Sequence, residues 1–247
     1  MKRLAAPLTA LVILSGMLAQ AGPAAAAPAI DAADFATKCS TGTYIVGFDL
    51  RVTGGPGVIT NDCFIAIAEG VTLSFINATI VGSDPSCCDF VVGDSLRRSR
   101  IRVINSTIDV GQALQLAAGC CGGDGEPGHP EEEGETLVIN SILRGGESVE
   151  VSGATADDDG RATVRNSLIE AGPLGIRVRA SVPADGGVSE VSDSILRTSG
   201  DVLIDTDQDG RTVAVRNSFD AAGPVVITTG AGGTCVSSGN APPVPCT

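Results

Sequence analysis

The sequence predicts an all-β chain folded as a right-handed parallel β-helix, a solenoid with three strands per coil and a cap at each end. The first observation is a repeat, because the stretch ATVRNSLIEAG at residues 162–172 has five related copies. These copies lie at residues 73–82, 101–111, 136–145, 189–197 and 213–220. The second observation is an alternation of apolar and polar residues on both sides of a central Asn or Asp. The third is a short segment after each glycine with an apolar residue on both sides of a central one, as in LQL, VEV and IRV, which predicts a third strand. The central residues of the copies are 24–35 residues apart. Tandem units with this spacing bury their apolar faces by stacking on one another.

The central residue of each copy predicts a bend between two short strands. Asn and Asp are the residues other than glycine that best tolerate the left-handed conformation of such a bend. Stacked at one position, their side chains can also hydrogen-bond from coil to coil and so form a structural ladder. The predicted ladder residues are Asn77, Asn105, Asn140, Asn166, Asp193 and Asn217. The crossover rule for parallel strands predicts the right-handed turn of the coil.

The first 29 residues have the pattern of a secretion signal, with Lys2 and Arg3 before an apolar core and small residues up to Ala29. The pattern allows cleavage anywhere between residues 21 and 29, and residues 30–247 are expected to form a single β-helix domain. The apolar run is too short to span a membrane in the mature protein. We therefore expect a secreted, extracellular protein.

Net charge restricts the partners. Without Lys2 and Arg3 the chain keeps 14 basic against 29 acidic residues, a net charge near −15. This excess argues against nucleic acid or an anionic membrane as the partner.

Residues 30–38 form a short segment of apolar and acidic residues. We expect this segment to cap the open end of the solenoid with a helical turn around Phe35. The run GVTLSFINATIVG at residues 70–82 follows. It resembles the opening of bacterial pectate-lyase-like right-handed β-helix proteins, where a segment bounded by cysteine precedes GVTLDLNGHTIxG. Asn77 stands at the glycine of that run and Ala78 at its histidine. The resemblance implies the fold, which carries lyases, hydrolases and inert adhesins alike.

Eight cysteines fit an oxidising compartment. Cys39 and Cys63 bracket the first coil, and Cys235 and Cys246 close a loop at the C-terminal end, so we expect a disulfide in each place. The tandem pairs Cys87-Cys88 and Cys120-Cys121 lie about one coil apart, and we expect two parallel bridges joining neighbouring coils. A four-thiolate zinc site near His129 is the alternative, although it lacks the usual C-x₂-C spacing.

Two acidic turns hold the same slot between a third strand and the next repeat, and the second reads DTDQDG. Alternating carboxylates of this kind make calcium the possible cofactor, with Asp205, Asp207 and Asp209 as the candidate ligands. The alternative is an Asx-Gly turn repeated because the coil turns there. The twelfth position of this candidate loop is Arg216, where a calcium loop has a bidentate Glu.

The third strands predict an outward column that contains Glu150 and Arg177. Arg177 is then one coil, about 4.8 Å, from Glu150, and Arg179 faces Asp205 in the same way. In pectate-lyase chemistry a calcium ion acidifies the proton beside a uronate carboxylate and an arginine removes it. Glu150, Arg177 and Arg179 are therefore the catalytic candidates, with structural ion pairs as the other explanation.

Two further columns flank the predicted bends. Asp109, Arg144, Glu170 and Arg197 alternate in sign from coil to coil, which favours ion pairing. The neighbouring column is Thr79, Thr107, Ile142, Leu168, Ile195 and Phe219. Strict alternation directs this column to solvent, whereas a rotation of the strand at the bend directs it into the core, and the sequence leaves both open.

The hypothesis for function is a secreted, disulfide-braced β-helix that acts as a non-catalytic extracellular or surface-interaction scaffold. Its partner is expected to be an extracellular polysaccharide or a surface protein. The alternative is a calcium-dependent pectate-lyase-like polysaccharide lyase. Self-assembly through the solenoid ends or an apolar side is a third class, and the sequence leaves the oligomeric state open.

Overall fold

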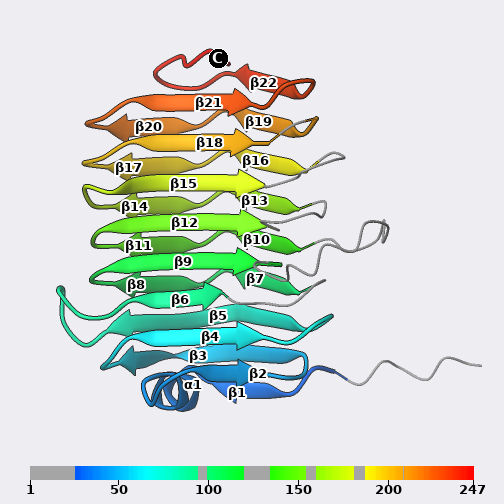
Figure 1. Ribbon diagram of the computed structural model, residues 1–247. Coiled ribbons are helices and arrows are strands. Elements are labelled where there is room, and N and C mark those ends of the chain that lie inside the picture. The colour runs from blue at the N-terminus through cyan, green and yellow to red at the C-terminus, as the bar shows by residue number, and fades with distance from the viewer. Residues whose placement is uncertain (1–25, 94–98, 120–133, 154–159, 181–186, 208) are drawn as a thin grey trace, which may run out of the picture.

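The computed structural model describes residues 26–93, 99–119, 134–153, 160–180, 187–207 and 209–247. These residues form a parallel β-solenoid of about seven turns, so the predicted fold class is confirmed. Each coil advances from the N-terminal end toward the C-terminal end with a right-handed turn (Figure 1). Within the described residues, no helix has the length and apolar character needed to cross a membrane.

Three strand positions make up each coil, and all their ladders are parallel. The first position is taken by the start of β5 (Thr72–Gly82), then β7 (Arg100–Ile104), β10 (Glu135–Ile139), β13 (Arg161–Arg165), β16 (Val188–Ser192), β19 (Arg211–Val215) and β22 (Thr234–Ser238). The second is taken by the end of β5, then β8 (Thr107–Val110), β11 (Ile142–Gly145), β14 (Leu168–Ala171), β17 (Ile195–Thr198) and β20 (Ser218–Ala221). Because β5 runs through both positions, these strands belong to one sheet, which has 14 strands with the addition of β1 (Ala29–Asp31) and β3 (Leu50–Ile59).

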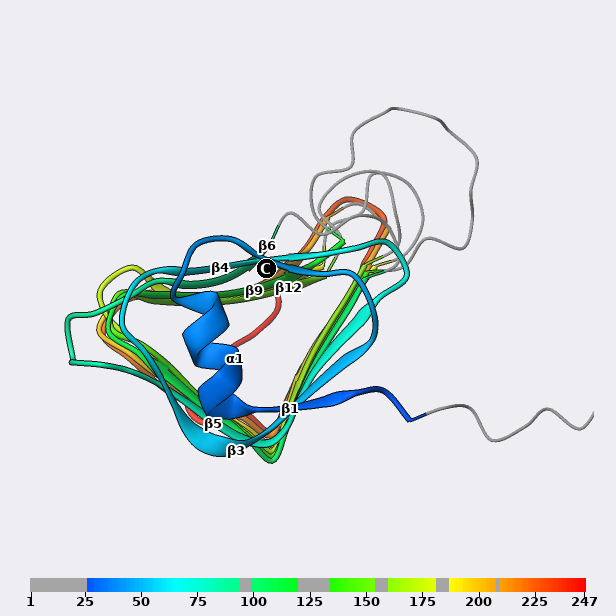
Figure 2. The ribbon, with the colours of Figure 1, turned by 90° about the horizontal axis from the view of Figure 1, so that it is seen from below.

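The third position forms a separate eight-stranded sheet. Its strands are β2 (Tyr44–Val46), β4 (Cys63–Ile67), β6 (Phe90–Gly93), β9 (Ala113–Ala118), β12 (Ser148–Gly153), β15 (Gly175–Ala180), β18 (Val202–Thr206) and β21 (Val225–Thr229). Seen along the axis, the three positions enclose a triangular cross-section (Figure 2).

Alternation along the strands fills this triangle with aliphatic columns. Val103, Val138, Val164 and Val191 stack in the first position and are fully buried. Because successive coils repeat the same residue at the same place, each side chain packs on its counterparts above and below.

The bends lie where the repeat places them in five of the six copies. Asn77, Asn105, Asn140, Asn166 and Asp193 have φ values between 48° and 52°. Their side chains are exposed. Coil-to-coil pairing is present at one step of the column, where Asn140 Nδ2 donates to Asn105 Oδ1 at 3.3 Å.

The sixth bend lies one residue earlier than the sequence alignment predicts. Arg216, with φ 55°, occupies the bend, and Asn217 is buried beside it. The register aligns Ser192 with Val215 and Leu196 with Phe219. Phe219 therefore faces the core, and Ser218 takes the position in the column that the sequence alignment gave to Phe219.

A buried polar column lies immediately after the bends, and the sequence analysis missed it. The backbone N–H after one bend donates to a side-chain oxygen of the next coil. Ala78 donates to Ser106 Oγ at 3.0 Å, and Ser106 in turn donates to Ser141 Oγ at 3.1 Å. The acceptors along the column are Ser106, Ser141, Ser167, Ser194, Asn217 and Asn240. We call these six residues the oxygen column.

A helix covers the N-terminal end, as expected. Helix α1 (Ala32–Cys39) begins after β1 (Ala29–Asp31), and Asp31 accepts a hydrogen bond from the backbone N–H of Ala33. Its Phe35 is fully buried and meets Phe75 edge to face, with the ring centroids 5.3 Å apart. β3 (Leu50–Ile59) then pairs with both β1 and β5. The helix lies across the open triangle in Figure 2.

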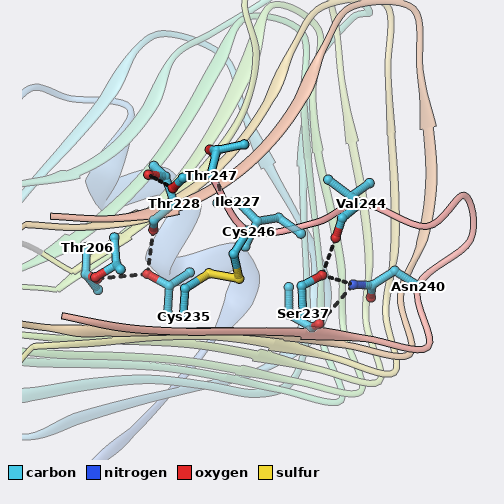
Figure 3. Close-up of a disulfide and its surroundings, with 12 residues drawn as sticks. Thr206, Ile227, Thr228, Cys235, Ser237, Asn240, Val244, Cys246 and Thr247 are labelled. Carbon is cyan, nitrogen blue, oxygen red and sulfur yellow. Dashed lines mark hydrogen bonds between the residues drawn. A yellow bond between two sulfur atoms is a disulfide. The ribbon is translucent and has the colours of Figure 1, made fainter.

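The last nine residues cover the other end. A disulfide joins Cys235 to Cys246 (Figure 3). Bridge pairings join Ser218 to Ala241 and Ile227 to Cys246. Asn240 closes the oxygen column, because its side chain accepts from the Asn217 backbone and donates to Ala214 O.

Replacing Ser167 by Ala should lower the free energy of unfolding by about 1–3 kcal/mol. The change leaves the Ser141 backbone N–H without its acceptor at 3.2 Å, and no hydroxyl remains to donate to Arg165 O. Ser218→Ala is the matched control, because Ser218 is an exposed serine at the start of β20. This substitution should change the free energy of unfolding by less than about 0.5 kcal/mol. Urea titration of both variants measures the difference. Equal midpoints would show that the oxygen column does not stabilise the stack.

Candidate functional site

The catalytic candidates lie together on the outer face of the third-position sheet. The register places Ser152, Arg179 and Asp205 on three successive strands, with Glu150 and Arg177 in the adjacent column. Arg177 and Arg179 each approach Asp205 Oδ2 to 3.6 Å. The predicted Arg179–Asp205 contact is thus present, and Arg177, placed opposite Glu150 by the register, also reaches the next strand.

Burial shifts the pKa of two members of this cluster. Desolvation raises the pKa of Asp205, and the guanidinium groups of Arg177 and Arg179 offset only part of the increase. Burial lowers the pKa of Arg179, but the hydrogen bond to Asp207 and the charges of Asp207, Asp205 and Glu150 outweigh it, so the pKa lies above its ordinary value. Arg179 is therefore held in its protonated form.

The predicted calcium ligands have protein partners of their own. Arg179 Nη2 contacts both carboxylate oxygens of Asp207, at 2.9 and 3.0 Å. Asp209 occupies a left-handed turn with φ 53°, and its backbone N–H donates to Ala231 O. In the described part of the chain, no three His, Cys, Asp or Glu side chains converge as a metal site would require. Calcium at Asp205, Asp207 and Asp209 stays a prediction.

The cysteines form two of the expected links and one unexpected link. Disulfides join Cys39 to Cys63 and Cys235 to Cys246. The prediction that the tandem cysteines bridge neighbouring coils is wrong for the first pair, because Cys87 bonds to Cys88. The pair lies in the turn between β5 and β6, and this turn is attached to the next coil by the hydrogen bond from Gly111 N to Cys87 O. Cys120, Cys121 and His129 lie outside the described residues.

The alternating charge column forms a continuous series of ion pairs along the second-position strands. Arg144 contacts both Asp109 and Glu170, Arg197 contacts Glu170 at 2.7 Å, and Asp220 extends the series at 3.2 Å from Arg197. We call these five residues the charge ladder. The hydrogen bond from Arg144 is the main reason that the pKa of Glu170 lies below its ordinary value.

A groove of about 580 Å³ runs beside the charge ladder at the corner between the second and third positions. Glycines line much of it, because the corner has no room for side chains: a Cβ on Gly172 would lie 1.8 Å from Gly146 O. Asp84 and Pro85, in the turn after β5, also line the groove.

The apolar column beside the charge ladder faces outward. Ile195 is 42% exposed, whereas Ile142 and Leu168 are half-buried. Their neighbours Leu143 and Ile169 are fully buried. Of the two alternatives for this column, the structure therefore selects the outward one.

Arginine–carboxylate pairs between neighbouring coils were also missed on the first-position strands and at the bends that follow them. Arg165 binds Glu190 with two hydrogen bonds, and Arg216 binds Asp193 in the same way. The signal for the second pair was present, since both residues occupy bends, but the misaligned sixth copy concealed it.

Comparisons with known protein families, with curated proteins and with solved structures each find no match for this chain.

Acid should weaken the charge ladder. Because the pKa of Glu170 is lowered in the folded state, its ion pairs stabilise the protein above about pH 4.5, and this contribution is lost as the pH falls through the folded-state pKa. Glu170→Gln should therefore cost about 1 kcal/mol at pH 7 and much less at pH 3. Glu147, exposed on the same coil as Arg144, is the control, and Glu147→Gln should leave the pH profile unchanged. Urea unfolding from pH 3 to 7 measures both, and a Glu170→Gln deficit that is independent of pH would contradict the assignment.

Adjacent residues of β14 should respond oppositely to a new charge. Leu168→Asp places the carboxylate on the outward column and should leave the circular dichroism spectrum intact. Ile169→Asp buries the carboxylate in the core and should abolish folding. Light scattering on the folded Leu168→Asp variant reports whether this column mediates association. Unfolding of both variants would mean that the column belongs to the core.

Proposed function

We propose that the protein is a secreted β-helix scaffold that presents its outer faces for binding and carries out no reaction of its own. The observation that supports this proposal is the pairing of charges at the catalytic candidates. Arg179 is held by Asp207 and lies beside Asp205, and its raised pKa opposes the proton loss that a general base needs. The same residues serve as ion pairs between stacked strands. An extracellular polysaccharide or a surface protein is the expected partner.

Secretion is supported by the signal-like first segment and by the disulfides of the described chain. The two ends of the allowed cleavage range differ in their consequences. Pro28 O accepts from Arg51 N, and Ala29 pairs with Arg51. Cleavage before Pro28 keeps this edge strand, so we infer that processing falls within residues 21–27.

A calcium-dependent polysaccharide lyase is the alternative, favoured by the resemblance of residues 70–82 and by two arginines beside two carboxylates. In that reaction calcium would supply the acidification of the proton beside the uronate carboxylate. Asp205 and Asp207 would be the ligands, in competition with their present arginine partners.

Arg179→Ala distinguishes the two functions. As a scaffold, the wild-type protein should release no unsaturated product from polygalacturonate, with or without calcium. The variant should unfold at a lower urea concentration, because the nearly buried Asp205 loses one of its two cationic neighbours. Its free energy of unfolding should fall by roughly 1–3 kcal/mol. Arg197→Ala, in the exposed part of the charge ladder, is the control and should cost less than about 1 kcal/mol. Product formation that is lost in Arg179→Ala and retained in Arg197→Ala would establish the lyase instead.

A further inference from the structure

A second hollow, of about 340 Å³, lies on the outer face of the first-position strands β13, β16 and β19. It is on a different sheet from the catalytic candidates and uses none of them. The structure describes every residue that lines it.

Two forked ion pairs border the hollow. Arg165 Nε and Nη2 donate to the two carboxylate oxygens of Glu190 at 3.0 and 2.8 Å, and Arg216 grips Asp193 with two bonds of 2.6 Å. Each fork uses two of the five N–H groups of an arginine, and each carboxylate oxygen keeps room for another donor. The hydrogen bond with Glu190 raises the pKa of Arg165, and that with Arg216 lowers the pKa of Asp193, so both of these side chains keep their charge over a wider pH range.

Aliphatic side chains occupy the space between the forks. Val213 and Val215 lie on β19, opposite Glu190 and Ser192 of β16, and both valines are half-buried. Ser192 is buried, and the two valines are the aliphatic residues that line the hollow. The hollow thus combines an apolar floor with donors and acceptors fixed at its border.

Charge and shape select the ligand chemistry. The two arginines and two carboxylates cancel, so the hollow attracts neither a cation nor an anion in particular. Neighbouring hydroxyl groups can accept from a guanidinium and donate to the adjacent carboxylate, and the C–H face of a pyranose ring suits an aliphatic floor. A hydrophobic side chain of a protein would cover the valines but leave the remaining donors and acceptors of both forks without partners, which is costly.

We propose that this hollow binds one ring of a neutral, hydroxyl-rich extracellular glycan, with the hydroxyl groups on the Arg165–Glu190 and Asp193–Arg216 forks and the ring face on Val213 and Val215. The proposal rests on the scaffold function and specifies its ligand class. Binding of a single ring is weak because the hollow is shallow, so a partner that engages several positions along the solenoid gains by multivalency.

Nuclear magnetic resonance tests this directly. Cellohexaose and mannohexaose are the neutral probes, and hexagalacturonate is the acidic comparator. The arginine Nε–H signals of Arg165 and Arg216 and the methyl signals of Val213 and Val215 are followed during each titration. A neutral hexamer should shift these signals in the wild-type protein, and hexagalacturonate should shift them less.

Variants then locate the site. Arg216→Lys keeps the charge but loses the fork and should weaken binding about tenfold. Val213→Asp puts a charge on the floor and should abolish binding. The matched controls are Arg197→Lys, in the charge ladder, and Val226→Asp, on the outer face of the other sheet, and both should keep wild-type affinity within about twofold.

Three outcomes overturn the proposal: no neutral hexamer shifts the signals, hexagalacturonate alone shifts them, or both hollow variants bind like the wild type. The first outcome is also the one expected if the hollow contacts a protein instead. Failure here leaves the scaffold function standing, because that function fails only if the polygalacturonate assay yields product.

Discussion

The oxygen column is the interaction on which the stacking of coils depends. The backbone N–H that follows each bend donates to a side-chain oxygen of the next coil and to no backbone carbonyl. An unpaired N–H buried there would cost about 1–3 kcal/mol, and the cost would recur in every coil. The next coil supplies the acceptor, and each serine hydroxyl donates in turn to a carbonyl two residues before it, as Ser141 does to Ile139. Each coil therefore needs its successor in register, and Asn240 in the C-terminal cap supplies the last acceptor.

Stacking also governs the charges on the outside. Identical positions recur about every 4.8 Å, so equal charges in one column would repel strongly. The charge ladder avoids this by alternating Asp109, Arg144, Glu170, Arg197 and Asp220, and the forks at the first-position strands do the same over single steps. The ion pairs hold these side chains between neighbouring coils, which accords with the scaffold function proposed above. The chain can thus carry an excess of acidic residues while the charged side chains of these columns are paired with opposite charges on neighbouring coils.

The prediction from sequence was strongest where a side chain's direction follows from its place in a strand. The bends at Asn105 and Asn166 and the inward Val103 and Val164 were predictable, because alternation assigns each residue to one face. The last copy failed because VAVRNSFD can be aligned on its asparagine, whereas burial of Phe219 and pairing with β17 require Arg216 at the bend. The prediction for the tandem cysteines failed because spacing along the chain cannot show that Cys87 and Cys88 form a disulfide with each other within one turn.

By itself, the sequence determined the solenoid, the core columns, the positions of most bends and two disulfides, because these follow from local periodicity and the repetition of one unit. The tertiary structure alone decided which partners the long polar side chains take. Arg177 stands opposite Glu150 in the backbone register, yet its guanidinium lies 3.6 Å from Asp205 on the next strand. The groove and the hollow were likewise invisible in the sequence. Both arise from the spacing of side chains on neighbouring coils, which depends on how the coils stack rather than on residues adjacent in the chain.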